Sequence, residues 1–146
     1  MTDEEVYKKI SRYCNFSERC HLDVRLKLAS WKVYGMQQEE MLVRLIDENL
    51  LNEQRYASAF ASGKFRINHW GKYKIHLALK QKQISDYCIR KALEAIDPAE
   101  YAEKVDYLIK KRRSLYPGQN DSELTTYLIG KGYETELITQ KITDEH

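Results

Sequence analysis

A stretch of 32 residues with basic but no acidic side chains is the part of this chain best suited to binding chemistry. Between Gln54 and Ser85 there is no Asp or Glu, although 22 acidic residues over 146 positions would place about five there. Seven basic residues occupy the stretch: Arg55, Lys64, Arg66, Lys72, Lys74, Lys80 and Lys82. This uneven charge is typical of a surface that binds a polyanion. The alternative is a set of ordinary solvated lysines that cover the helix bodies.

Phosphate binding needs several cations held in a row, and each phosphate neutralised on a single strand steepens the salt dependence of binding by about 0.7 log units. Lys64 and Arg66 end one expected helix, and the next expected helix follows Gly71. The basic residues of the two helices can therefore converge at the joint between them. The predicted contacts to nucleic-acid phosphates or to an acidic protein surface are Lys64, Arg66, Lys72, Lys74, Lys80 and Lys82.

Aromatic side chains accompany this basic stretch. Trp70 and Tyr73 lie within it, and aromatic rings among cations can stack on unpaired bases. Trp70 can equally serve as a packing anchor between two helices. A second basic run, made of Lys110, Lys111, Arg112 and Arg113, either extends the same surface or compensates the dipole at a helix C-terminus.

The residue types needed for catalysis or metal binding do not occur at useful spacings. Cys14, Cys20 and His21 lack the spacing of a zinc site. Cys20 and His21 are adjacent, so their side chains diverge by about 100° on a helix and cannot form a nucleophile–base pair. No glycine-rich phosphate loop is present. We therefore expect no enzyme activity, no metal and no cofactor.

The cellular setting is predicted from what the chain contains. The three cysteines are few and odd in number, which indicates reduced thiols. The N-terminus is acidic, and no run of 18 apolar residues occurs. These features predict a cytoplasmic protein with no membrane association.

Helix signals account for nearly the whole chain. Thr2 and Glu5 form a capping-box pattern, Ser17 is the expected cap of the second helix, and Asp97-Pro98 is a strong helix start. Only two prolines and six glycines interrupt these signals. The sequence predicts an all-α fold of about nine helices without a sheet.

An apolar pattern occurs three times and predicts a repeat array. Five apolar positions recur 49 residues apart, first as Ile75, Leu79, Ile84, Ile89 and Leu93 and then as Leu124, Leu128, Tyr133, Ile138 and Ile142. A looser copy with three extra residues runs through Val24, Leu28, Met36, Met41 and Leu45. The period predicts tandem units, divided as an N-terminal helix (1–16), two three-helix repeats (17–70 and 71–117) and a shorter repeat of two helices (118–146). Such arrays act through a long surface.

One segment resembles a known family. Leu50-Leu51-Asn52-Glu53-Gln54-Arg55-Tyr56-Ala57, followed by Arg66, Gly71, Ile75, Leu79-Lys80 and Ile84-Ser85, is similar to the RecX family of recombinase regulators. The resemblance extends from about Tyr13 to the end of the chain. Gln83 departs from it, because the family usually has glycine there, and His69-Trp70 replaces a more basic stretch.

The resemblance implies a function and a partner. It implies an elongated, curved protein of three tandem three-helix repeats, which binds the RecA filament on single-stranded DNA in its helical groove. We also expect a monomer. It further implies suppression of strand exchange and ATP hydrolysis, with roles in DNA repair, recombination and the SOS response. The alternative is a stand-alone protein that binds single- or double-stranded DNA through helix-turn-helix-like modules. The segment after Asn120 carries six acidic residues against Lys131 and Lys141, which argues against three equivalent reading heads.

Overall fold

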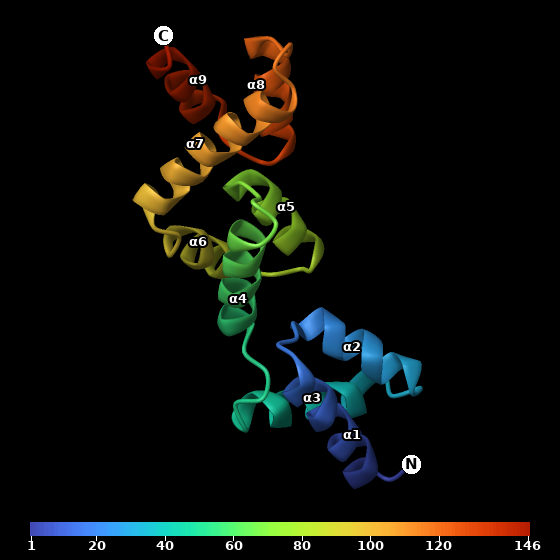
Figure 1. Cartoon of the computed structure of the whole chain (residues 1–146). Coiled ribbons are helices and arrows are strands. Elements are labelled where there is room, and N and C mark those ends of the chain that lie inside the picture. The colour runs from blue at the N-terminus through green and yellow to red at the C-terminus, as the bar shows by residue number, and fades with distance from the viewer.

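The chain folds entirely into helices. The computed structural model describes all 146 residues and contains nine helices and no strand, which confirms the predicted all-α class. The helices are α1 (Asp3–Phe16), α2 (His21–Ser30), α3 (Gly35–Asp47), α4 (Glu53–Arg66), α5 (Lys72–Gln81), α6 (Asp86–Glu94), α7 (Pro98–Leu115), α8 (Asp121–Gly130) and α9 (Thr135–Asp144). Figure 1 shows an elongated molecule with α1–α3 at one end and α7–α9 at the other. None of these helices is both long and apolar enough to cross a membrane.

Side-chain caps set most helix starts where the sequence predicted them. The capping box of Thr2 and Glu5 is formed, and Asp97 caps α7 with Pro98 as its first residue. The side chains of Asn52, Ser85 and Asn120 likewise accept hydrogen bonds at the starts of α4, α6 and α8. Such caps satisfy backbone amides that the helix itself leaves without a partner.

The start of α2 differs from the prediction. Ser17 does not cap it; the helix begins at His21, and Cys20 is the cap. The Cys20 Sγ accepts a hydrogen bond from the Asp23 amide at 3.4 Å, and the Asp23 carboxylate accepts one from the Cys20 amide at 3.2 Å. A fully buried cysteine therefore takes the role that serine or threonine usually has. Burial raises the pKa of the Cys20 thiol to about 11, so this cap stays protonated.

Most of the repeated apolar positions form the core, and Leu93 is partly buried against it. Met36 is 78% exposed, whereas Val33 is 4% exposed, so Val33 and not Met36 occupies the third position of the pattern in the first copy. The Val33 amide donates to the Leu28 carbonyl at 3.0 Å, which is the bond that Ile84 makes to Leu79 in the second copy. The three extra residues of the first copy therefore follow this turn and do not precede it.

The same turn explains why the RecX family, which part of this chain resembles, usually has glycine at the position of Gln83. Gln83 has a φ of 61°, and the matching residues Lys32 and Gly132 have φ of 62° and 102°. This left-handed conformation costs a residue with a Cβ about 1–2 kcal/mol, and glycine adopts it freely. The turn therefore has the same left-handed residue in all three copies, although only the third copy has a glycine, Gly132, at this position.

Two hydrophobic clusters divide the chain. One contains 11 buried residues from α1–α3 and the segment up to Leu51, and the other contains 20, nearly all from α4–α9. Helix α4 packs against α5 and α6, and α7 packs against α8 and α9. The boundaries predicted near residues 70 and 117 lie between α4 and α5 and between α7 and α8, and each of these helix pairs is packed together. The period shows which helices are equivalent, but it does not show which helix is the first of each repeat. A division into independently folding units stays a prediction.

Candidate nucleic-acid interface

The loop between α4 and α5 lies directly against the loop between α8 and α9. The Gly71 amide donates to the Lys131 carbonyl at 2.7 Å, and the Tyr73 amide donates to the Gly132 carbonyl at 3.0 Å. A Cβ added to Gly71 would lie 2.3 Å from the Gly132 carbonyl carbon. The two backbones can approach this closely only because residue 71 has no side chain.

Buried tyrosines reinforce this contact. The Tyr101 hydroxyl accepts a hydrogen bond from the Lys72 amide at 2.9 Å and donates to the Glu134 carboxylate. The Tyr133 hydroxyl donates to the His69 carbonyl at 2.9 Å. Burial is the main cause that raises the pKa of both tyrosines, so both keep their donor hydrogens. The α4–α6 and α7–α9 groups are thus joined by a single hydrogen-bonded core.

Lysines from three parts of the chain gather around this contact. Two of them lie over the Trp70 ring, with Lys64 Nζ 4.8 Å and Lys74 Nζ 4.7 Å from the ring centroid. The Lys131 ammonium donates to the Asn68 carbonyl at 2.9 Å, in the same loop as Trp70. Two lysines of α7 lie beside this loop: Lys104 contacts His69, and Lys111 Nζ lies 5.7 Å from the Tyr107 ring, which is 5.6 Å from the His69 ring. We call the group the junction cluster: Lys64, His69, Trp70, Lys74, Lys104, Lys111 and Lys131.

The positive charges of the junction cluster act on one another. Burial lowers the pKa of Lys131, and the charges of Lys74 and Lys111 lower it further. Burial also lowers the pKa of His69, with added effects of Lys104, Lys131 and Lys111. Lys104 Nζ lies 2.9 Å from His69 Nδ1. Like charges disfavour the charged form of a neighbour. The lowered pKa values therefore indicate that the positive side chains of the junction cluster repel one another.

No carboxylate oxygen lies within 4.0 Å of any lysine in the junction cluster. Nine of the 24 lysines and arginines of the chain do have such a partner, and the other fifteen do not, so the lack of a partner alone does not distinguish the cluster. Its distinguishing feature is that the charges of several such lysines act on one another, and an external polyanion would relieve their repulsion.

The structure brings only part of the predicted site into this cluster. Lys64, Lys74, Trp70 and Lys111 belong to it. Three other predicted contacts are paired with carboxylates from outside the acid-free stretch: Arg66 with Glu100 (3.5 Å), Lys80 with Asp86 (2.8 Å) and Lys82 with Asp23 (2.9 Å). Folding therefore brings acidic side chains from other parts of the chain next to three of the predicted cations.

The remaining predicted residues point elsewhere. Lys72 packs over the Tyr101 ring at 5.0 Å, and Arg112 lies 4.0 and 4.1 Å from the rings of Tyr116 and Tyr127. Arg113 is paired with Asp121 and Glu145, and the side chain of Lys110 is exposed. Tyr73 is 63% exposed, and only its backbone amide takes part in the contact between the loops. Whether these residues bind a partner stays a prediction.

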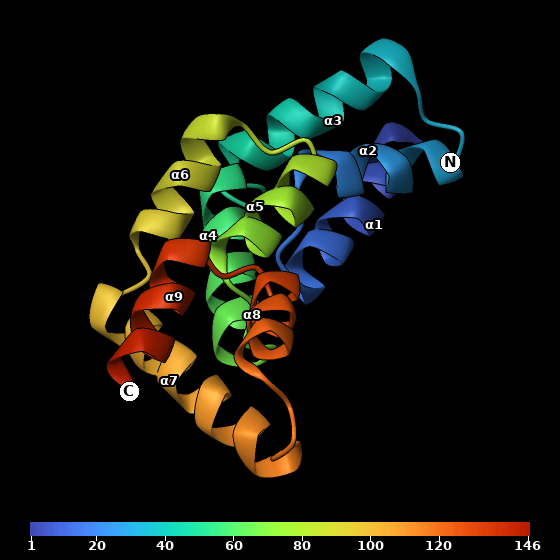
Figure 2. The ribbon, with the colours of Figure 1, turned by 90° about the horizontal axis from the view of Figure 1, so that it is seen from above.

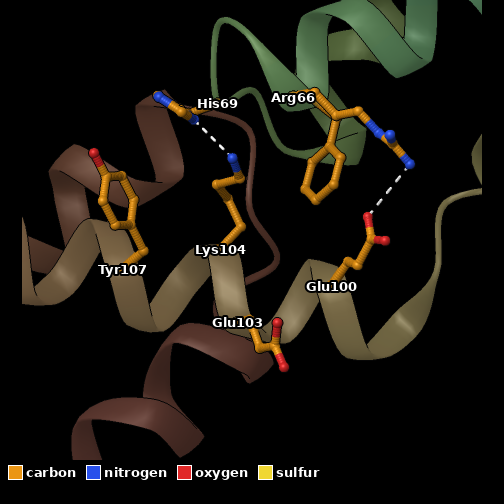
Figure 3. Close-up of a pocket in the computed structure, with 7 residues that line it drawn as sticks. Arg66, His69, Glu100, Glu103, Lys104 and Tyr107 are labelled. Carbon is orange, nitrogen blue, oxygen red and sulfur yellow. Dashed lines mark hydrogen bonds and ion pairs between the residues drawn. The ribbon is translucent and has the colours of Figure 1, made fainter.

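Beside the junction cluster lies an open cavity of about 430 Å³. Its charged lining is mixed, because Arg66 pairs with Glu100 and Lys104 contacts His69, while Glu103 also borders it (Figure 3). The two glutamates make this cavity a poor anion site and mark the edge of the cationic surface.

Sequence reasoning missed Lys104, Lys131 and His69 as members of the cluster. A signal for two of them existed: Lys104 and Lys111 are seven residues apart, which places them on one helix face, and Lys131 matches Lys82 in the 49-residue repeat. No group of three or more His, Cys, Asp or Glu side chains is placed to hold a metal.

The fold and this surface define an all-α tandem-repeat protein with a cationic junction. Comparison with known proteins gives its family. The model of the RecX second three-helix domain matches residues 52–93, which form α4–α6. The regulatory protein RecX of Chlorobaculum tepidum is 30% identical to this chain over an alignment that covers 85% of the chain and 76% of the relative. The chain therefore belongs to the RecX family of regulatory proteins.

Other relatives agree with this assignment. The regulatory protein RecX of Prosthecochloris aestuarii is 28% identical over 99% of this chain and 97% of its own length. The regulatory protein RecX of Streptococcus uberis is 31% identical, and the alignment covers 68% of this chain but only 40% of that longer relative. The crystal structure of RecX from Lactobacillus salivarius has a TM-score of 0.89 at 23% identity, covering 97% of this chain and 95% of that one. The elongated helical-repeat fold is thus shared.

Proposed function

We propose that this chain regulates a RecA-like recombinase. It binds the filament that the recombinase forms on single-stranded DNA and lowers its rates of strand exchange and ATP hydrolysis, acting by binding and not by catalysis. The name regulatory protein RecX, carried by its relatives, supports this role. The single structural observation that carries it is the junction cluster, where five lysines meet without a carboxylate partner.

The physical reason is electrostatic. A phosphate backbone supplies the negative charge that the junction cluster lacks, and its binding releases counterions. The array of three helix groups adds an extended surface, which suits contact with a regular polymer of protein and nucleic acid. Together these features favour a ligand that is both long and negatively charged.

A recombinase assay tests the function. The chain is titrated into RecA assembled on single-stranded DNA, and ATP hydrolysis and strand exchange are followed. We expect both rates to fall as the chain saturates the filament. Unchanged hydrolysis and exchange at saturating chain would refute the proposal. A stand-alone DNA-binding protein would instead bind DNA equally well without RecA, and excess DNA would abolish its effect on hydrolysis.

Matched lysine variants test the site. The variant Lys74→Gln/Lys111→Gln removes two charges from the junction cluster, and we expect the slope of log affinity against log salt to become shallower by about 1.4, or 0.7 for each phosphate contact. The control Lys8→Gln/Lys91→Gln removes two exposed lysines that belong to no predicted contact. An equal change of slope in both variants would show that net charge matters and that the cluster does not.

A further inference from the structure

A second set of cations and aromatic rings lies on the first helix group. The Trp31 ring has Lys9 Nζ at 5.9 Å and Lys27 Nζ at 5.7 Å from its centroid. Lys27 also lies 5.3 Å from the centroid of Tyr13, and the Arg19 guanidinium lies 3.9 Å from the same ring. Trp31 thus has two lysines near its ring, as Trp70 has in the junction cluster.

A cleft connects the two sets. It has a volume of about 510 Å³ and lies between the first helix group and α4. Tyr13 and Arg19 line one side of it, and Phe60 and Lys64 line the other. Lys64 Nζ lies 5.5 Å from the Phe60 ring and 4.8 Å from the Trp70 ring, so it belongs to both the cleft and the junction cluster. Cations and rings therefore lie on both sides of this cleft, with Trp31 and Tyr13 in one set and Phe60 and Trp70 in the other.

Acidic side chains also line the cleft, but each is already paired. Glu18 accepts a hydrogen bond from Arg55 at 2.6 Å, and Asp23 accepts one from Lys82 at 2.9 Å. Arg19 and Lys64, by contrast, have no carboxylate within 4.0 Å. The cleft is therefore cationic on balance. Figures 1 and 2 both place α6 on the side of α4 away from the first helix group, so α6 lies off this path.

We propose that one unpaired nucleic-acid strand follows this path, from the junction cluster across the cleft to Trp31. We name the path the aromatic track: Lys9, Tyr13, Arg19, Lys27, Trp31, Phe60, Lys64, Trp70 and Lys74. The inference rests on the proposed function and deepens it, because it names the strand's route and its chemical class. Bases stack on the tryptophan rings while the flexible lysine side chains move from ring to phosphate. A duplex keeps its bases stacked inside and cannot use the rings.

The chain's two tryptophans allow a direct test, because each can be observed alone. Trp70→Phe leaves Trp31 as the only tryptophan, and Trp31→Phe leaves Trp70. Each variant is titrated with oligothymidylate of about 20 nucleotides, longer than the about 4–16 nucleotides that a single-strand-binding domain covers. We expect quenching of both tryptophans with the same half-saturation concentration. A labelled strand followed by fluorescence anisotropy reports binding independently.

The outcomes separate this inference from the function on which it rests. If Trp70 is quenched and Trp31 is not, at saturating strand, the aromatic track is wrong while the junction cluster stands. If anisotropy shows no binding of the strand by the chain alone, the aromatic track is wrong, while the proposed function is judged separately by the recombinase assay. Equal affinity for a duplex of the same length would also overturn the track, because stacking requires unpaired bases.

Substitution of the first helix group gives a second, quantitative readout. Trp31→Ala is expected to weaken binding of the long strand by about 5-fold or more, which corresponds to the smallest contribution expected from one stacked base. An oligonucleotide of about five nucleotides can bind at the junction cluster alone, so its affinity should be nearly unaffected. Lys9→Gln/Lys27→Gln should make the salt slope shallower by about 1.4 for the long strand. Lys91→Gln on α6 is the matched control, since Lys91 also lies beside a ring, 5.7 Å from Tyr87. An equal loss in control and variant would count against the track.

Discussion

Replacement of Gly71 by alanine is the most direct test of how the junction is built. An added Cβ would lie 2.3, 2.4 and 2.5 Å from three backbone atoms of Gly132 and Tyr133. Ordinary contacts of a Cβ lie beyond 3.4 Å, so the two loops must separate by roughly 1 Å. That separation breaks or stretches the two backbone hydrogen bonds that join the loops, at 2.7 and 3.0 Å.

The cost follows from these contacts. Each hydrogen bond contributes about 0.5–1.5 kcal/mol, and forcing atoms into a packed site costs about 1–3 kcal/mol. Gly71→Ala should therefore lower the free energy of unfolding by about 2–6 kcal/mol. For a chain of this size, the melting temperature should fall by about 4–24 °C. Polyanion binding should weaken as well, because Lys74 and Lys131 are held together by these loops.

The matched control is Gly63→Ala within α4. A Cβ at Gly63 would meet no atom within 4 Å, so alanine should stabilise the helix by about 0.5–1 kcal/mol. Urea denaturation of both variants gives the comparison. An unchanged unfolding midpoint for Gly71→Ala, or a change of the same sign as Gly63→Ala, would refute the close backbone contact on which the cluster depends.

Three further predictions concern the supporting structure. Gln83→Gly should raise the free energy of unfolding in urea by about 0.5–1 kcal/mol, because residue 83 has a φ of 61°; a loss of stability would contradict this. Tyr101→Phe should lower it by about 1–3 kcal/mol, because the amide at the start of α5 loses its buried acceptor; a neutral result would mean that water replaces the hydroxyl. Burial raises the pKa of Asp23, but hydrogen bonds, first that from Lys82, outweigh burial and leave this pKa below its ordinary value. The contribution of Asp23 is therefore present above the unfolded-state pKa of about 3.9 and is lost as the pH falls through the lower folded value. Between pH 5 and 3 the wild type should lose more stability than Asp23→Asn, and parallel curves would show that the ion pair is unimportant.

The amino-acid sequence by itself determined the helical class, most helix starts and the repeated core positions. The caps at Thr2, Asn52 and Asp97 were predictable because each side chain binds an amide three residues away. The core positions were predictable because helical spacing places them on one face. Met36 was misassigned, since three extra residues can be placed on either side of a turn and only packing shows that Val33 is buried.

Only the tertiary structure decided which cations remain free. Lys82 lies in an acid-free stretch, yet Asp23, which is 59 residues away in the chain, neutralises it. Lys131 lies outside that stretch, yet the contact of Gly71 with its neighbour Gly132 brings it to Lys74. A cap depends on neighbours along the chain, whereas the net charge of a surface depends on which helices pack together. The sequence therefore indicated a cationic surface, and the packing of the loops chose its members.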